Sequence, residues 1–346
     1  MRGEGFEKGW SMRAFMVVVL ALGVLWGGYW FAGSMALQKG ADAWFAGQVA
    51  QGRAATNGGV EVRGFPNRFD LTLTDVHLAD PVTGFGWDAP FVQLFSMTWK
   101  PWHLIAALPN VQTVTLPDQS VGLASTKLQG SLKLVPGAAL ALDGIVVDGV
   151  DLVATSSLGW VVKAARAELA TRQDASVANG HEVSVTVTGL VPDAGLLAAI
   201  AGTSDLPGLV EVARVDLVAG FSAPLDRFAG DTRPQVVALT VKEGQVRWGD
   251  LVVTVKGSVV ADAGGLAEGR FDINIENWRK MIAPAVAMGL IRAEIAQTVE
   301  NMMGLLAQQS GDGTSLELPL VMTAGRMSLG PIPLGPAPRM TRAAQG

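Results

Sequence analysis

Residues 14–32 of this 346-residue chain form an uncharged run of 19 residues, 16 of them apolar: AFMVVVLALGVLWGGYWFA. A helix rises about 1.5 Å per residue, so this run spans about 28 Å, close to the roughly 30 Å hydrocarbon core of a bilayer. Trp26, Tyr29 and Trp30 gather at its C-terminal end, and amphipathic rings favour the headgroup layer. The run therefore predicts one transmembrane helix, which leaves the long remainder of the chain on one side of a membrane.

Basic residues precede this run, namely Arg2, Lys8 and Arg13. Because positive charge stays on the cytoplasmic side, we expect a single-pass protein of the bacterial inner membrane with a cytoplasmic N-terminus and a periplasmic body. The alternative is a cleaved signal peptide, since Ser34-Met35-Ala36 has a small-x-small pattern. The apolar run is longer than the apolar region of such a peptide, which usually has about 7 to 15 residues. The body is exported in either case.

The composition excludes several classes of function. Charged residues make up 16% of the chain, the net charge is −5 and no Lys/Arg run occurs, which argues against a nucleic-acid partner. The chain has no cysteine, so thiolate metal sites are excluded. Neither a nucleophile elbow, a phosphate-binding glycine loop nor a zinc-protease motif occurs, so we expect a non-enzymatic protein without cofactor or metal. Outside residues 14–32, apolar residues and glycine make up about 59% of the chain, above the roughly 45–50% of average domains.

Alternation of apolar and polar residues dominates the chain after residue 60, as in Phe69, Leu71 and Leu73. Such a period of two indicates antiparallel strands with one dry and one wet face. Roughly fourteen to sixteen strands are expected, and a single sheet of that size curls. The sequence predicts a mainly β fold with minor α content, an elongated and strongly curved antiparallel sheet with an open groove. Tight turns are expected at Glu243-Gly244, Ala263-Gly264-Gly265 and Ala324-Gly325.

Few helices are expected in the body. Residues 36–55 continue the N-terminal helix, Pro101 begins a short helical turn, and Val191–Ala201 forms another short helix. The longest is predicted over residues 278–308, after the N-cap residue Asn277, with a kink at Pro284. Its apolar stripe is expected to pack on the sheet, including through Ile291, Ile295 and Val299.

These elements divide the chain into five segments. They are a cytoplasmic tail at 1–13, a transmembrane anchor at 14–32, a juxtamembrane helical segment at 33–58, a curved β-sheet domain at 59–330 that includes the helix 278–308, and a proline-rich C-terminal tail at 331–346.

Two groups of residues are candidates for function. The first group is apolar and alternates along two strands, where it is expected to line a lipid groove: Val183, Val185, Val187, Phe271, Ile273 and Ile275. The alternative is that these six side chains simply meet the helix 278–308. The second group is a bend motif of Gly64, Pro66 and Arg68, in which Arg68 either binds a phosphate or carboxylate or pairs with a local acid or carbonyl.

Two segments carry a resemblance to a known family, GFPNRFDLTLTDVHL and GFGWDAPFVQLFSMTWKPWHLIAALPN. They resemble an uncharacterised family of alphaproteobacterial envelope proteins, domain of unknown function 2125, over most of the body. That resemblance implies no activity. The chain is more loosely similar to AsmA-like proteins in the order of its expected elements. An anchor is followed by a strand, a short helix at KPWHLIAAL and another strand, and the late segment VKGSVVADAGGLAEGRFDINIENW precedes a long helix. The looser resemblance implies a curved sheet with an apolar groove and a role in lipid movement or outer-membrane homeostasis.

The leading functional expectation is a protein that holds a lipid or acyl chain in an apolar groove, in envelope lipid handling. The alternative is a structural or protein-interaction module of the cell envelope without a ligand. The expected partners are the inner membrane, through the N-terminal helix, and either lipid or another envelope protein.

Overall fold

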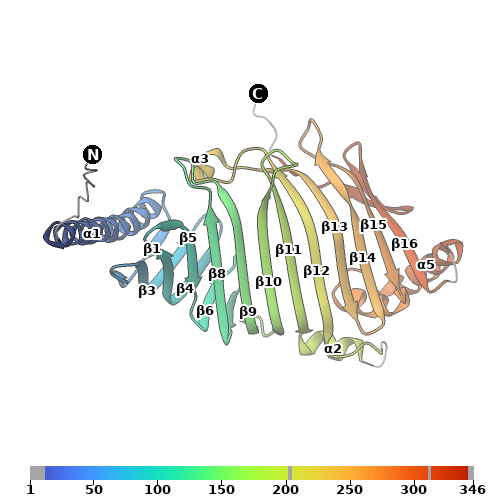
Figure 1. Cartoon of the computed structure of the whole chain (residues 1–346). Helices are drawn as coiled ribbons and strands as arrows, with labels where there is room; N and C mark the ends of the chain where they lie inside the picture. The colour runs from blue at the N-terminus through green and yellow to red at the C-terminus, as the bar shows by residue number, and fades with distance from the viewer. Residues whose placement is uncertain (1–11, 202–204, 311–312, 342–346) are drawn as a thin grey trace, which may run out of the picture.

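The computed structural model describes residues 12–201, 205–310 and 313–341. These residues form an N-terminal helix, an antiparallel sheet of 18 strands and several short helical segments (Figure 1). The prediction of a mainly antiparallel β protein with an N-terminal apolar helix and a C-terminal helix is confirmed. The strand count exceeds the fourteen to sixteen expected, because several short strands pair with one half of a longer neighbour.

The strands are bounded as follows: β1 Ala54–Thr56, β2 Gly59–Arg63, β3 Arg68–Asp80, β4 Phe85–Met97, β5 Lys100–Ala107, β6 Val111–Thr115, β7 Ser120–Ala124, β8 Lys127–Leu134, β9 Leu142–Ser156, β10 Val161–Asp174, β11 Gly180–Val191, β12 Val210–Phe221, β13 Val236–Trp248, β14 Leu251–Ala261, β15 Ala267–Glu276, β16 Ser315–Thr323, β17 Arg326–Leu329 and β18 Ile332–Pro336. The helical segments are α1 Met12–Ala50, α2 Ala194–Ile200, α3 Ala229–Thr232, η1 Trp278–Met281, α4 Ile282–Ala287, η2 Ala293–Ile295 and α5 Ala296–Ser310.

The sheet is a meander with one branch. From β8 to β18 each strand pairs with the next along the chain. Between β4 and β9 the sheet divides into two branches. One half of β4 pairs with β5, which pairs with β8 and through it connects to β9. The other half of β4 pairs with β6, which pairs with β7 and through it connects to β9. At the N-terminal edge, β1 and β2 both pair with β3. The tilt of the strands changes progressively from β3 to β16 (Figure 1), as expected from the handed twist of β-strands.

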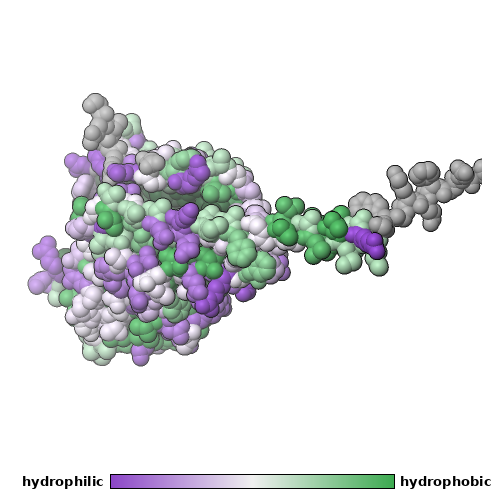
Figure 2. Space-filling view, turned by 90° about the vertical axis from the view of Figure 1, so that its left-hand side faces the viewer, coloured by the Kyte–Doolittle hydropathy of each residue, from purple (hydrophilic) through white to green (hydrophobic). Residues whose placement is uncertain are grey.

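Helix α1 consists of two halves that differ in burial. Its N-terminal half is apolar and exposed. An 18-residue stretch of the helix has a mean hydropathy of 1.9, and 6% of that stretch is buried. This half is long and apolar enough to cross a membrane and stands clear of the body (Figure 2). The C-terminal half lies on the first strands, where it buries Trp30, Ser34 and Phe45. The helix ends at Ala50 and strand β1 follows, so the helical segment expected over 33–58 is shorter than predicted.

The C-terminal helix over 278–308 is present but divided. A 3-10 turn and α4 are separated from η2 and α5 by a break around Gly289, whose φ is +72°. A left-handed residue of this kind ends a helix, so the interruption lies after Pro284 rather than at it. Helix α2 agrees with the short helix expected over Val191–Ala201.

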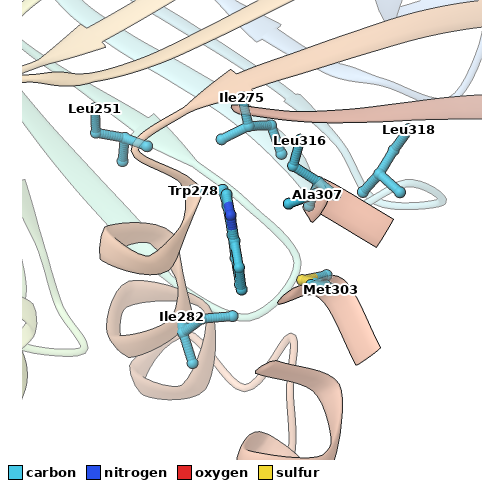
Figure 3. Packing of buried hydrophobic residues seen from close by; sticks show 8 residues of the cluster. All are labelled: Leu251, Ile275, Trp278, Ile282, Met303, Ala307, Leu316 and Leu318. Carbon is cyan, nitrogen blue, oxygen red and sulfur yellow. The ribbon is translucent and has the colours of Figure 1, made fainter. Parts of the chain in front are cut away.

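The largest buried cluster joins this helical segment to the sheet. Trp278 is 0% exposed and lies among Ile275, Leu316, Ile282 and Met303 (Figure 3). Its indole Nε1 donates a hydrogen bond to the Gly313 carbonyl over 3.1 Å, which satisfies the polar tip of a buried ring. The apolar stripe therefore packs on the sheet as predicted, with one correction. Ile295 is 47% exposed and does not belong to the buried cluster, although Ile291 and Val299 pack against it.

Two local predictions are wrong. The segment beginning at Pro101 is strand β5 rather than a helical turn, since Ile105, Ala106 and Ala107 pair on both sides, with β4 and β8. Glu243-Gly244 is not a hairpin turn but a β-bulge inside β13, where the register with β12 and β14 shifts.

Candidate functional site

One face of the sheet carries an uninterrupted apolar row that crosses thirteen strands. Consecutive residues in the row are direct antiparallel partners, so their side chains lie on the same face. From β2 to β16 the row consists of Val62, Leu71, Leu94, Ala106, Gly130, Val147, Leu169, Val185, Val215, Gly244, Val255, Ile273 and Leu318. With strands about 4.8 Å apart, the row extends roughly 58 Å.

The neighbouring row on the opposite face is polar almost throughout. It consists of Glu61, Thr72, Gln93, Ala107, Gln129, Asp148, Glu168, Thr186, Arg214, Gln245, Thr254, Asn274 and Glu317. Across these thirteen strands the two rows therefore separate an apolar face from a polar one, and the polar face interacts readily with water.

Helices cover the apolar face at its two ends. At the N-terminal end, Phe45 of α1 packs with Val76, Ala89 and Val92. At the C-terminal end, α4 and α5 pack on Ile275 and Leu316. A further buried cluster, formed by Ile200 of α2 with Val210 and Trp248, lies at the ends of β12 and β13.

The middle of the apolar face has no such cover. Within the part of the chain that the structure describes, no residue of β8, β9 or β10 belongs to a buried hydrophobic cluster, and β11 contributes only Leu190. We call these mid-sheet side chains the central apolar face. They are half-buried, and they are Leu128, Leu132, Ile145, Val147, Ala167, Leu169, Val183, Val185, Val187, Ala213, Val215 and Leu217. An apolar surface of this kind marks an interaction site in many soluble proteins.

The six sequence-predicted lining residues all lie on the apolar face, in three adjacent rows. Val183, Val185 and Val187 belong to the central apolar face. Four strands further on, the same rows contain Phe271, Ile273 and Ile275. Of these, Ile273 and Ile275 pack with the helical segment, and Phe271 is buried with Met322 and Ala337. The structure thus joins the six on one surface, and only the three valines stand on its uncovered part.

The predicted bend motif forms the turn between β2 and β3. Gly64 has a φ of +102°, and a Cβ there would lie 2.8 Å from the Arg68 carbonyl oxygen, so the turn requires glycine. Arg68 Nη2 donates to Asp70 Oδ2 over 2.7 Å, and the Arg68 carbonyl accepts a hydrogen bond from Trp30 Nε1 over 2.7 Å. The motif therefore connects the sheet to α1.

A hollow on the polar face was not foreseen from the sequence. Its volume is about 680 Å³, and it spans β8 to β13 behind the central apolar face. Its charged lining includes Arg172, Glu182 and Lys242. Glu182 accepts from both Arg172 and Lys242, and these hydrogen bonds lower the pKa of its carboxyl group. Alternation along the sequence does not reveal this hollow, since two of its lining residues, Lys242 and Glu243, lie in a β-bulge of β13.

The charges around this hollow compensate one another. Asp216 lies beside Ser184 and Arg214, whose hydrogen bonds lower the pKa of its carboxyl group. Lys133 contributes a further positive charge from β8. Because cations and anions alternate and pair here, the hollow presents no concentrated charge, and the apolar face is the stronger candidate site.

Among the described residues, no group of three or more His, Asp or Glu side chains is placed to hold a metal ion. Comparison with curated proteins gives no match, and comparison with solved structures gives none. The looser AsmA-like resemblance therefore remains an expectation from the sequence. A family match covers residues 30–338, which are most of the chain and nearly all of the sheet. The chain belongs to the DUF2125 family, described as an uncharacterized protein conserved in bacteria.

Proposed function

We propose that this protein is an inner-membrane-anchored periplasmic protein that holds lipid acyl chains on its central apolar face. The observation that carries the proposal is the apolar row across thirteen strands, uncovered at β8–β11. The mechanism is non-covalent, because burial of apolar surface is sufficient to retain a chain. Each buried methylene contributes about 0.8 kcal/mol, so ten methylenes contribute about 8 kcal/mol before the cost of ordering the chain.

The helix α1 supports acyl chains as the ligand. Its exposed apolar half places the sheet beside a membrane, and its C-terminal half rests on the same apolar face that continues into the uncovered region. The basic residues before the apolar run favour a cytoplasmic N-terminus and a periplasmic sheet. Lipid is therefore the most abundant apolar partner within reach of this face.

The test compares two neighbouring residues on one strand. Val185 and Thr186 are both half-buried, but their side chains lie on opposite faces of β11. A photo-crosslinking amino acid at each position, in intact cells, measures what covers each face. We expect lipid adducts at position 185 and not at position 186. Equal labelling at the two positions, or no lipid adduct at position 185, would refute the proposal.

A second candidate function is a protein-interaction module of the cell envelope. It is favoured by the C-terminal end of the apolar face, where Ile273 and Ile275 are already occupied by the chain's own helical segment. A helix from another protein would cover the central face in the same way. Protein adducts in place of lipid adducts at position 185 would favour this alternative.

A further inference from the structure

Two hairpin tips of the sheet lie against α1 where its apolar run ends. The first tip is the turn at residues 64–67 between β2 and β3, and the second is the turn at residues 98–99 between β4 and β5. Trp26 Nε1 donates to the Pro66 carbonyl over 2.9 Å, and the Tyr29 hydroxyl donates to the Thr98 carbonyl over 2.7 Å. The Trp30 indole adds the hydrogen bond to the Arg68 carbonyl. Three aromatic residues of α1 thus fix both tips at one level of the helix.

The tips are also joined to each other. The backbone N–H and the hydroxyl of Thr98 both donate to the Asn67 carbonyl, each over 3.1 Å, and Thr98 is fully buried. The Phe65 ring packs against Trp30 and Phe31 of α1, with centroid distances of 5.4 and 5.9 Å. The tips and the helix therefore form one unit joined by hydrogen bonds and ring contacts.

Large apolar side chains nevertheless remain exposed on these tips. Phe65 and Trp99 are each 56% exposed, and Met97 is 43% exposed. Lys100 adds an exposed positive charge directly after Trp99. Aromatic rings with a flanking basic residue, at the end of an apolar helix, are the composition that favours the headgroup layer of a membrane.

We propose that these two tips form a second membrane contact, in which Phe65, Met97 and Trp99 enter the headgroup layer beside α1. The proposal rests on the membrane anchoring of α1 stated under the proposed function. It adds that the sheet does not swing freely on its anchor but stands on the membrane with a fixed orientation. Strand β3 has 13 residues, so the opposite end of the β3–β4 hairpin stands about 40 Å away from the tips.

The absence of cysteine allows a direct test with the full-length chain. Single-cysteine variants Phe65→Cys, Met97→Cys and Trp99→Cys carry an environment-sensitive fluorophore in phosphatidylethanolamine–phosphatidylglycerol vesicles, with spin-labelled lipids as quenchers. Val82→Cys and Leu158→Cys are matched controls, since both are exposed apolar residues in turns other than the two tips. We expect several-fold stronger quenching at positions 65, 97 and 99 than at 82 and 158. Met97 is the conservative site if the aromatic substitutions disturb the fold.

A variant in the exposed half of α1, Val24→Cys, separates the two proposals. Strong lipid quenching at position 24, with labels at 65, 97 and 99 quenched no more than the controls and open to aqueous iodide, would overturn the tip contact and leave the anchor intact. If position 24 is also not quenched, the membrane anchor itself is refuted. Quenching at position 24 and at the tips, but not at 82 and 158, is the result that supports the proposal.

Discussion

Gly33 of α1 and Phe69 of β3 meet with no space between them for another atom. A Cβ at position 33 would lie 2.5 Å from Phe69 Cζ, and the Phe69 ring is buried, so the ring has little room to move. Trp30 stacks near the same ring at a centroid distance of 6.1 Å. This close approach of helix and strand positions α1 against the sheet.

This contact predicts the effect of Gly33→Ala. Alanine favours a helix over glycine by about 1 kcal/mol, but the forced displacement of Phe69 costs about 1–3 kcal/mol. We expect a net loss of stability and faster hydrogen exchange in β3, measured on the detergent-solubilised chain. Gly40→Ala is the matched control in the same helix, because nothing lies within 4 Å of its Cβ position. The control gains stability, and an equal gain at Gly33 would show that the helix does not rest on Phe69.

The covered end of the apolar face predicts a contrast between two isoleucines. Ile275 is 3% exposed in the cluster around Trp278, whereas Ile295 is largely exposed. Ile275→Asp buries an unpaired charge, and we expect it to lower the free energy of unfolding by about 4 kcal/mol or more. Ile295→Asp changes it by about 0.5 kcal/mol or less. Urea unfolding followed by circular dichroism measures both, and similar losses in the two variants would place Ile295 in the core.

Alternation was sufficient to predict a mainly antiparallel β fold and to identify which residues of one strand share a face. It was not sufficient to relate distant strands, because that requires the register. Val241 and Gly244 lie on the same face although they are three residues apart, since a bulge at Lys242 and Glu243 inserts an extra residue. That Val185 and Ile273 belong to one row therefore followed only from the pairing of the intervening strands.

Tertiary contacts decided the elements that sequence analysis missed. Pro101 is a favourable helix start in isolation, but β5 satisfies its backbone groups on both sides by pairing with β4 and β8. The periodicity of residues 278–308 correctly indicated helices that pack on the sheet. It did not locate the break, which depends on the left-handed conformation of Gly289.

The buried His181 predicts a dependence of stability on pH. Its ring is 4% exposed, its Nδ1 has no hydrogen-bond partner, and burial lowers the pKa of the imidazole from its ordinary value of 6.5. The unfolded chain therefore binds a proton more readily than the folded chain. This contribution to stability is complete above pH 6.5 and is lost as the pH falls through 6.5 toward the lower folded pKa.

The measurement is the Tm of the wild type and of His181→Gln at pH 7.5 and 5.5. Carboxyl groups with lowered pKa values titrate below this window, so they do not contribute to the difference. Burial and the nearby Lys133 and Lys100 lower the pKa of His103. His103 therefore adds a similar dependence of stability on pH in both proteins. We expect a smaller loss of Tm in the variant, and an unchanged loss would mean that His181 is hydrated in the folded state.

The final prediction concerns two directly opposed pairs on the two faces of the sheet. Leu169 and Val185 are register partners on the central apolar face, and Glu168 and Thr186 are partners on the polar face one residue away. The double variant Leu169→Gln, Val185→Thr removes apolar contact worth about 2 kcal/mol from a bound chain, which corresponds to more than a tenfold loss of affinity. Native mass spectrometry of the purified protein measures the lipid that it retains. The double variant Glu168→Gln, Thr186→Ser is the control of similar size, and we expect it to retain lipid like the wild type. Because all four side chains lie at the surface or are half-buried, both variants are expected to fold. Equal lipid retention in the two variants would contradict binding on the apolar face.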